Sequence, residues 1–238
     1  MGKKLSFLLV SFFIIFSFSK SFAVDNHITE ALKALAEKCR DYDCVYYQQN
    51  ILRDTKICQP KKEVAFGDPL LSRTKKITGH ILYEGVWPAK YSYSVTPSKV
   101  HGYEIVVKVH FKNQNLFGAQ VLGEIQTNLN LAAEIWREKV PNDLFQFKFL
   151  VVKNAKEADF SVRLTGKISR GPYYSEWSNL WQPAMYAHEI GHMMGLDDEY
   201  GTVLIHDRCN ERSLMCDDTE GRPREYHYYQ ILKRTHCN

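Results

Sequence analysis

Apolar and polar residues follow a regular order through the second half of this 238-residue chain. Apolar residues alternate with polar ones in short segments, which predicts strands at 103–111, 145–152 and 159–164. They recur at helical spacing in others, which predicts helices at 119–140, ended by Pro141, at 183–194 and at 224–234. A strand, a helix, two strands and two helices in this order are typical of an α+β fold with a small sheet.

The first hundred residues are less regular. Helical spacing predicts a helix at 26–40 and a shorter one at 44–53. The segment 59–78 is rich in Lys, Pro and Gly, which predicts a loop, and the aromatic and β-branched residues of 79–97 predict a hairpin. We therefore expect an N-terminal region of helices and loops at 24–98, ahead of a regular domain at 99–238.

The chain begins with the features of a secretory signal peptide at 1–23. Two lysines precede the apolar run 5–18, and Ser21-Phe22-Ala23 is small at its first and third places, so cleavage is expected after Ala23. The run has about 14 residues, fewer than the roughly 20 that span a bilayer, so a secreted or periplasmic protein is expected. Cleavage lowers the formal net charge from +4 to +1, which argues against nucleic acid or a membrane as partner.

Six cysteines stand in two groups of three, an even number that predicts disulfide bonds in an exported chain. They are Cys39, Cys44 and Cys58 near the N-terminus, and Cys209, Cys216 and Cys237 near the C-terminus. The pairing stays open, but if all six are paired, at least one bridge joins the two groups.

The segment 188–198 carries the most specific chemical pattern, His-Glu-x-x-His-x-x-Gly-x-x-Asp. His188 and His192 are four residues apart, so on a helix both imidazoles reach one metal ion from the same face. Glu189 stands where a carboxylate can take a proton from a water on that metal. Gly195 allows a left-handed turn that can bring Asp198 back as a third ligand. Three ligands leave one coordination position open, which is typical of a catalytic zinc site.

This pattern resembles that of the metzincin proteases, which carry a methionine-containing turn after the zinc helix. Its aspartate variant resembles the snapalysin family of small secreted bacterial proteases. In that family the zinc motif ends Gly-Leu-x-Asp-x-Tyr, which 195–200 match, and a cysteine precedes the Leu-Met of the turn, as Cys209 precedes Leu214-Met215 here. The close match covers about 30 residues.

The resemblance implies a metzincin-like catalytic domain: a small twisted sheet with a backing helix, a zinc helix, a methionine turn and a C-terminal helix. It implies one zinc ion per chain, held by His188, His192 and Asp198, with Glu189 as general base. Tyr200 is expected to help stabilise the tetrahedral intermediate, and Met215 to form an apolar floor below the metal. Two acidic neighbours, Asp197 and Glu199, are possible competitors for the third position.

The function expected from these residues is that of a secreted, monomeric zinc endopeptidase acting on protein or peptide substrates. An open sheet edge above the zinc helix could accept an extended peptide as an added strand. Two alternatives remain: a narrow-specificity peptidase or amidase acting on cell-wall or host substrates, and a binding module that keeps zinc without catalysis. Glu189 favours an enzyme, because a structural zinc site needs no carboxylate there. The region 24–98 is either a removable pro-region or an accessory layer. Histidines outside the motif are expected to be surface or hydrogen-bonded structural residues: His80, His101, His110, His206, His227 and His236.

Overall fold

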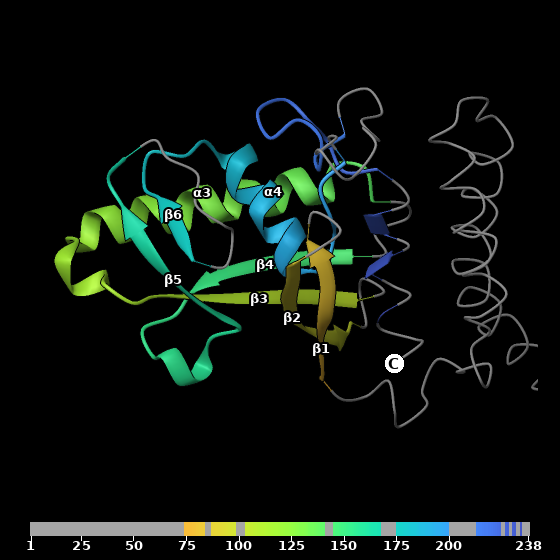
Figure 1. Cartoon of the computed structure of the whole chain (residues 1–238), viewed down its shortest axis with the longest axis horizontal. Helices are drawn as coiled ribbons and strands as arrows, with labels where there is room; N and C mark the ends of the chain where they lie inside the picture. Colours follow the sequence, from red (N-terminus) through yellow and green to blue (C-terminus); the bar gives the residue numbers. More distant parts are fainter. Residues whose placement is uncertain are drawn as a thin grey trace, which may run out of the picture.

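The computed structural model describes residues 74–83, 87–98, 103–140, 145–167, 175–199, 213–224, 227–228, 230–231 and 234 (Figure 1). The predicted signal peptide, the predicted helices at 26–40 and 44–53, and Tyr200 lie outside these residues. So do all the cysteines except Cys216, which is not a free thiol. Within the described part of the chain, no helix has the length and apolarity to cross a membrane.

Among the fully described elements, six strands form one mixed sheet and two α-helices pack beside it, so the predicted α+β class is confirmed. The strands are β1 (Lys75–Tyr83), β2 (Trp87–Pro97), β3 (Tyr103–Phe111), β4 (Phe145–Val151), β5 (Phe160–Thr165) and β6 (Glu176–Ser178). The α-helices are α3 (Ala119–Arg137) and α4 (Pro183–Met193), and two single 3₁₀ turns are η2 (Gln114–Leu116) and η4 (Ala155–Glu157).

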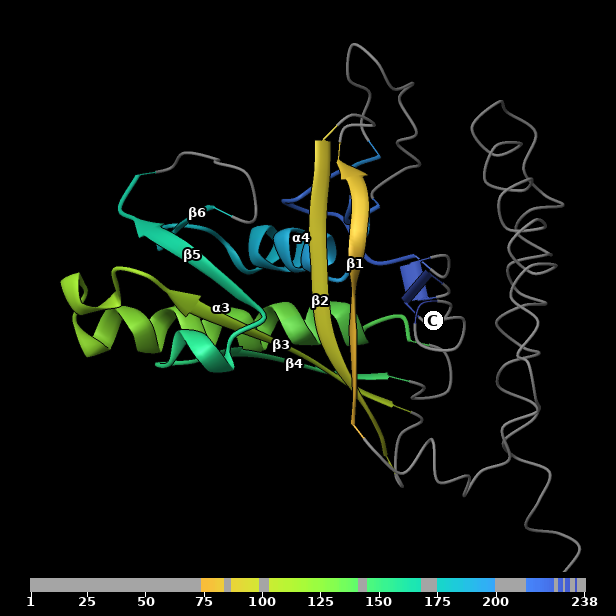
Figure 2. The same ribbon diagram turned by 60° about the horizontal axis from the view of Figure 1, so that its bottom comes forward.

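Strand β3 is the centre of the sheet. On one edge it pairs with β4 in parallel from Tyr103 to Val109. On the other edge it pairs first with β2, antiparallel, and then with β5, parallel, over its last three residues. Because β2 leaves β3 after four paired residues, the β1–β2 ribbon diverges and crosses β3 at a steep angle (Figure 2).

The predicted elements agree with the structure except at some ends. The strand at 103–111 is confirmed as predicted, and those at 145–152 and 159–164 match to within one residue. The hairpin is confirmed as β1 and β2, but the prediction of a loop over 59–78 is wrong from Lys75 onward. The lysines there are exposed, yet Ile77 faces the core beside Tyr93, so burial of alternate residues decides the conformation. The sheet thus spans the expected boundary at 98/99.

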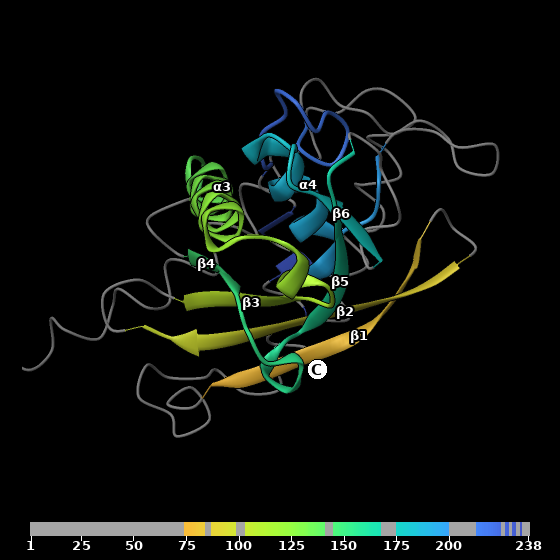
Figure 3. The same ribbon diagram turned by 90° about the vertical axis from the view of Figure 1, so that its left-hand side faces the viewer.

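Both helices lie on the same face of the sheet (Figure 3). That face is apolar: β3 contributes Ile105, Val107, Val109 and Phe111, and β4 contributes Phe145, Phe147 and Phe149, all buried. Helix α3 packs on it through Ile125, Leu129, Ala132, Ala133 and Trp136. Burying an aliphatic or aromatic side chain of this size contributes about 1.5–3 kcal/mol, so this layer fixes α3 on the sheet.

Helix α4 is buried along almost its whole length between α3 and the strands that diverge from β3. Pro183 begins it, where the missing N–H has no partner to lose. At its first turn, Tyr186 packs edge-on against Trp177 and Trp181 and donates a hydrogen bond of 2.7 Å to the Ser178 carbonyl. In its middle, the Ala187 carbonyl accepts a 2.9 Å bond from the Trp136 indole. These contacts fix the position of the next residues, which carry the motif.

Candidate metal centre

Helix α4 ends in a turn that reverses the chain at Gly195. Gly195 has φ +91°, a left-handed conformation that side chains with a Cβ rarely adopt. Its N–H donates to the His192 carbonyl at 2.8 Å, and the N–H of Leu196 donates to the Gly191 carbonyl at 3.0 Å. This pair of bonds is a Schellman motif, and it sends residues 196–199 back along the helix toward the two histidines.

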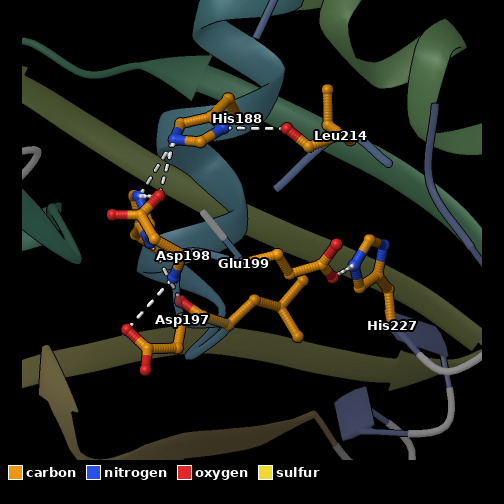
Figure 4. A network of polar contacts seen from close by, with 8 residues as sticks. His188, Asp197, Asp198, Glu199, Leu214 and His227 are labelled. Atoms are coloured by element: carbon orange, nitrogen blue, oxygen red, sulfur yellow. Dashed lines mark hydrogen bonds and ion pairs between the residues drawn. The ribbon is translucent and has the colours of Figure 1, made fainter. Parts of the chain in front are cut away.

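Three side-chain atoms converge beside the helix. His188 Nε2 and His192 Nε2 are 3.1 Å apart, and Asp198 Oδ1 lies 3.2 Å from the first and 3.3 Å from the second (Figure 4). Zinc bonds of about 2.0–2.2 Å at tetrahedral angles would separate ligand atoms by about 3.3–3.5 Å. The triangle is within a few tenths of an ångström of that spacing, and all three residues are buried, so this group can hold a metal ion.

Hydrogen bonds on the far side of each ring set the tautomers of the two histidines. The Nδ1 of His188 donates to the Leu214 carbonyl at 2.8 Å, and the Nδ1 of His192 donates to the Leu196 carbonyl at 2.9 Å. Carbonyls only accept, so in the neutral rings the proton sits on Nδ1 and the lone pair on Nε2. Both lone pairs therefore face Asp198, an arrangement of three acceptors that favours a cation among them.

The two acidic neighbours of Asp198 are directed elsewhere (Figure 4). Asp197 Oδ1 accepts a 3.1 Å hydrogen bond from the backbone N–H of Asp198. The Glu199 carboxylate lies 2.9 Å from His227 Nε2, and the Glu199 N–H donates to the Met215 carbonyl at 3.0 Å. Of the three acidic side chains, the structure therefore brings Asp198 to the histidines.

Without a metal, the group holds a proton. Burial lowers the pKa of His192, but the adjacent Asp198 carboxylate, with smaller contributions from Glu189 and the Leu196 carbonyl, raises it to about 9. Burial raises the pKa of Asp198, but the two histidines outweigh it and hold that pKa far below its usual range. The two shifts have one cause, the mutual attraction of the Asp198 carboxylate and the protonated His192 ring.

The predicted general base, Glu189, is also buried, with 6% of its surface exposed. Its charge is among the groups that raise the pKa of His192, so the carboxylate lies close to the ligand group. Buried carboxylates next to a metal-ligand set are typical of catalytic centres. Sequence reasoning thus located this residue on the correct helix and within electrostatic reach of the ligands.

Met215 lies against α4 at Gly191, which stands between the two histidines in the sequence. A Cβ added to Gly191 would be 2.5 Å from Met215 Sδ, so the glycine leaves room for the methionine side chain. The preceding carbonyl, from Leu214, holds the His188 ring, and the Met215 carbonyl holds the backbone of Glu199. Leu214 and Met215 therefore support both helix α4 and the segment 196–199 that returns along it.

Two supporting residues from the C-terminal segment were not predicted from the sequence. His227 contacts Glu199, as described above, and Arg234 donates to the Gly195 carbonyl at 2.6 Å while its guanidinium lies 4.9 Å from the Tyr91 ring centre. A basic group near the end of a helix complements its dipole. Both residues fall within the helix predicted at 224–234, where the described residues from His227 onward are helical and Arg224 lies before the helix. Helical spacing alone does not show which distant carbonyl or carboxylate each would reach.

Replacing Gly195 with alanine should destabilise the protein. A Cβ there would be 2.9 Å from the Tyr91 ring and would require a left-handed backbone, so we expect a loss of about 1–3 kcal/mol and weaker metal binding. Gly123→Ala is the control, because it lies in α3 with nothing within 4 Å of the new Cβ. Urea unfolding of both variants is the measurement. An unchanged midpoint for Gly195→Ala would contradict the role given to this turn.

The chain matches no protein-family model, no curated protein and no solved structure. The centre itself offers two nitrogen atoms and one oxygen atom in a buried triangle, with a further buried carboxylate on the same helix.

Proposed function

We propose that the protein is an exported zinc-dependent endopeptidase with a metzincin-like catalytic domain. The observation that carries the proposal is the triangle of His188 Nε2, His192 Nε2 and Asp198 Oδ1, with Glu189 on the same helix. Three protein ligands at tetrahedral spacing leave one coordination position for water or substrate. A purely structural zinc site is usually closed by a fourth protein ligand.

The donor set fits zinc. Imidazole nitrogens and a carboxylate oxygen are ligands that Zn²⁺ accepts in tetrahedral geometry, and calcium or magnesium sites instead take six or more oxygens. The hydrogen bonds from both Nδ1 atoms to carbonyls keep the Nε2 atoms available, as is usual for histidines that bind metals. His188, His192 and Asp198 would therefore hold the ion.

A bound zinc ion supplies Lewis acidity, which makes water nucleophilic near neutral pH and polarises a peptide carbonyl. The role of Glu189 is to accept a proton from the attacking water and to pass it to the leaving amine. Its burial near His192 keeps this carboxylate out of bulk solvent, where it would be less effective as a base. The histidines and Asp198 hold position and take no part in this proton transfer.

Three further features support the metzincin-like arrangement. A mixed sheet carries the long helix α3 on one face, α4 follows it, and Met215 packs against α4 after the returning turn. The described residues from His227 to Arg234 are helical and come last in this order. Strand β6 (Glu176–Ser178), at the end of the sheet order, lies directly before α4 in the chain.

The test is a digestion of a mixed peptide library by the purified protein, followed by mass spectrometry. We expect internal cleavages that disappear when a chelator removes the metal and return when zinc is added back, because the ion supplies the Lewis acidity. Metal content measured on the same sample should be one zinc per chain. Cleavage that persists in the metal-free protein, or its absence in the zinc-loaded protein, would contradict the proposal.

Zinc binding should depend on pH in a defined direction. Zinc must displace the proton that His192 holds up to about pH 9, so we expect apparent affinity to rise about tenfold per pH unit from about pH 6.5 toward 9. The stability of the metal-free protein should fall over the range in which zinc affinity rises. The stability that the raised pKa of His192 contributes is complete below about pH 6.5 and is lost as pH rises through about 9. Calorimetry in two buffers of different ionisation enthalpy measures the proton release. Zinc affinity independent of pH over this range would contradict the predicted release of a proton from His192.

A further inference from the structure

A buried hydrogen bond joins the segment 196–199, which returns along α4, to the C-terminal segment. Glu199, next to the ligand Asp198, and His227, 28 residues later, are 3% and 1% exposed, and Glu199 Oε1 lies 2.9 Å from His227 Nε2 (Figure 4). Neither side chain belongs to the ligand triangle. Burying a carboxylate is costly unless a partner compensates it, so we looked for a role of this pair in the site.

The direction of the hydrogen bond follows from the far side of the ring. His227 Nδ1 accepts a 3.0 Å bond from the backbone N–H of Arg224, which can only donate. In the neutral ring the proton is therefore on Nε2, and His227 donates it to Glu199. The ring is held in turn by packing beside Trp136, whose indole donates to a carbonyl of α4. His227 is thus a fixed donor built into the core.

The contact between Glu199 and His227 affects which acidic residue reaches the two histidines. Three consecutive acidic residues, Asp197, Asp198 and Glu199, stand within reach of two histidines that attract a carboxylate. The backbone bond from Glu199 to Met215 and the side-chain bond to His227 hold Glu199 on the side away from the triangle. With Glu199 fixed, the preceding residue is aligned with Nε2 of both histidines.

We propose that Glu199 and His227 form a positioning pair that selects Asp198 as the third metal ligand and holds it in place. The inference rests on the proposed zinc site and adds to it two residues that touch neither metal nor substrate. Loss of groups that orient a ligand typically costs about 10–100-fold in metal affinity, and this range is the expected effect.

The histidine allows a matched pair of substitutions. In His227→Asn, the short amide can still accept from the Arg224 N–H but cannot reach Glu199. In His227→Gln, the longer amide places an N–H donor near the former position of Nε2. We expect zinc affinity, measured by chelator competition, to fall about 10–100-fold in His227→Asn and to stay within about threefold of wild type in His227→Gln. The Co²⁺-substituted His227→Asn protein should also show an altered ligand-field spectrum, because its third ligand is no longer held.

Two further variants separate positioning from general loss of stability. Tyr228 lies next to His227, and its buried hydroxyl donates to the Trp136 carbonyl at 2.8 Å. Tyr228→Phe removes this hydrogen bond, which does not involve the segment 196–199. We expect it to lower stability and leave zinc affinity and the Co²⁺ spectrum unchanged. Glu199→Met, which keeps roughly the side-chain volume and removes both oxygens that could accept from His227, should weaken zinc binding in the same direction as His227→Asn, and it serves as the test if His227→Asn does not fold.

Wild-type zinc affinity and an unchanged Co²⁺ spectrum in folded His227→Asn or Glu199→Met would overturn the positioning role. So would an equal loss of affinity in Tyr228→Phe. These readouts do not depend on hydrolysis. A wild-type protein that binds zinc but cleaves no peptide would refute the proposed endopeptidase and leave the pair intact. An active wild type with unaltered metal binding in both variants would refute the pair alone.

Discussion

Glu189→Gln should leave the zinc site loaded and abolish most peptide cleavage. The amide has nearly the same size as the carboxylate, and Glu189 is not one of the three ligand residues, so metal affinity should stay within about threefold of wild type. Without a base for the attacking water, kcat should fall by about 10²–10⁴-fold. A coupled measurement of zinc content and single-substrate kinetics on the same preparation tests this.

The two readouts of Glu189→Gln have separate meanings. Full zinc content with near wild-type cleavage would refute the mechanism in which this carboxylate moves the proton. Loss of zinc together with activity would instead show that Glu189 supports the ligand group, since its charge contributes to the raised pKa of His192. Far-UV circular dichroism of the variant is the control for folding.

Asp198→Asn should have the largest effect on metal binding. It removes the charge from the triangle and replaces one oxygen by an amide nitrogen that cannot bind zinc through a lone pair. We expect zinc affinity to fall by more than the about 10–100-fold typical of losing a group that only orients a ligand, and cleavage to fall with it. Chelator competition measures the affinity.

Asp197→Asn is the matched control for this variant. It changes an adjacent carboxylate whose Oδ1 accepts from the Asp198 N–H, a bond that an amide oxygen can also accept. Zinc affinity in this control should remain close to that of wild type. A greater loss in Asp197→Asn than in Asp198→Asn would show that the third ligand had been misassigned.

The ligand group could be predicted because its geometry is local. His188 and His192 lie one helical turn apart, and Gly195 defines a known helix ending, so short-range rules suffice to bring Asp198 back. Short-range rules do not show why Asp198, and neither of its two neighbours, reaches the histidines. This depends on which atoms Asp197 and Glu199 bond, and the partner of Glu199 is His227, 28 residues away.

The elements of the fold show the same division between local and distant causes. Long periodic segments such as 103–111 and α3 were found, because many residues repeat one signal. Strand β6 has three residues and no detectable period, and it was missed. The start of β1 was missed because its lysines suggest a loop, and only pairing of Ile77 with Tyr93 on the core face makes that segment a strand.

The Tyr91 ring, described above beside Gly195, also connects strand β1 to the turn that ends α4. A Cβ on Gly79 in β1 would be 2.3 Å from the Tyr91 hydroxyl, so the ring lies across the glycine of the neighbouring strand and reaches from there to the end of α4. Strand β1 is therefore part of the support for the turn that carries Asp198. Removal of β1 would therefore take away a strand of the sheet and the support of this turn together.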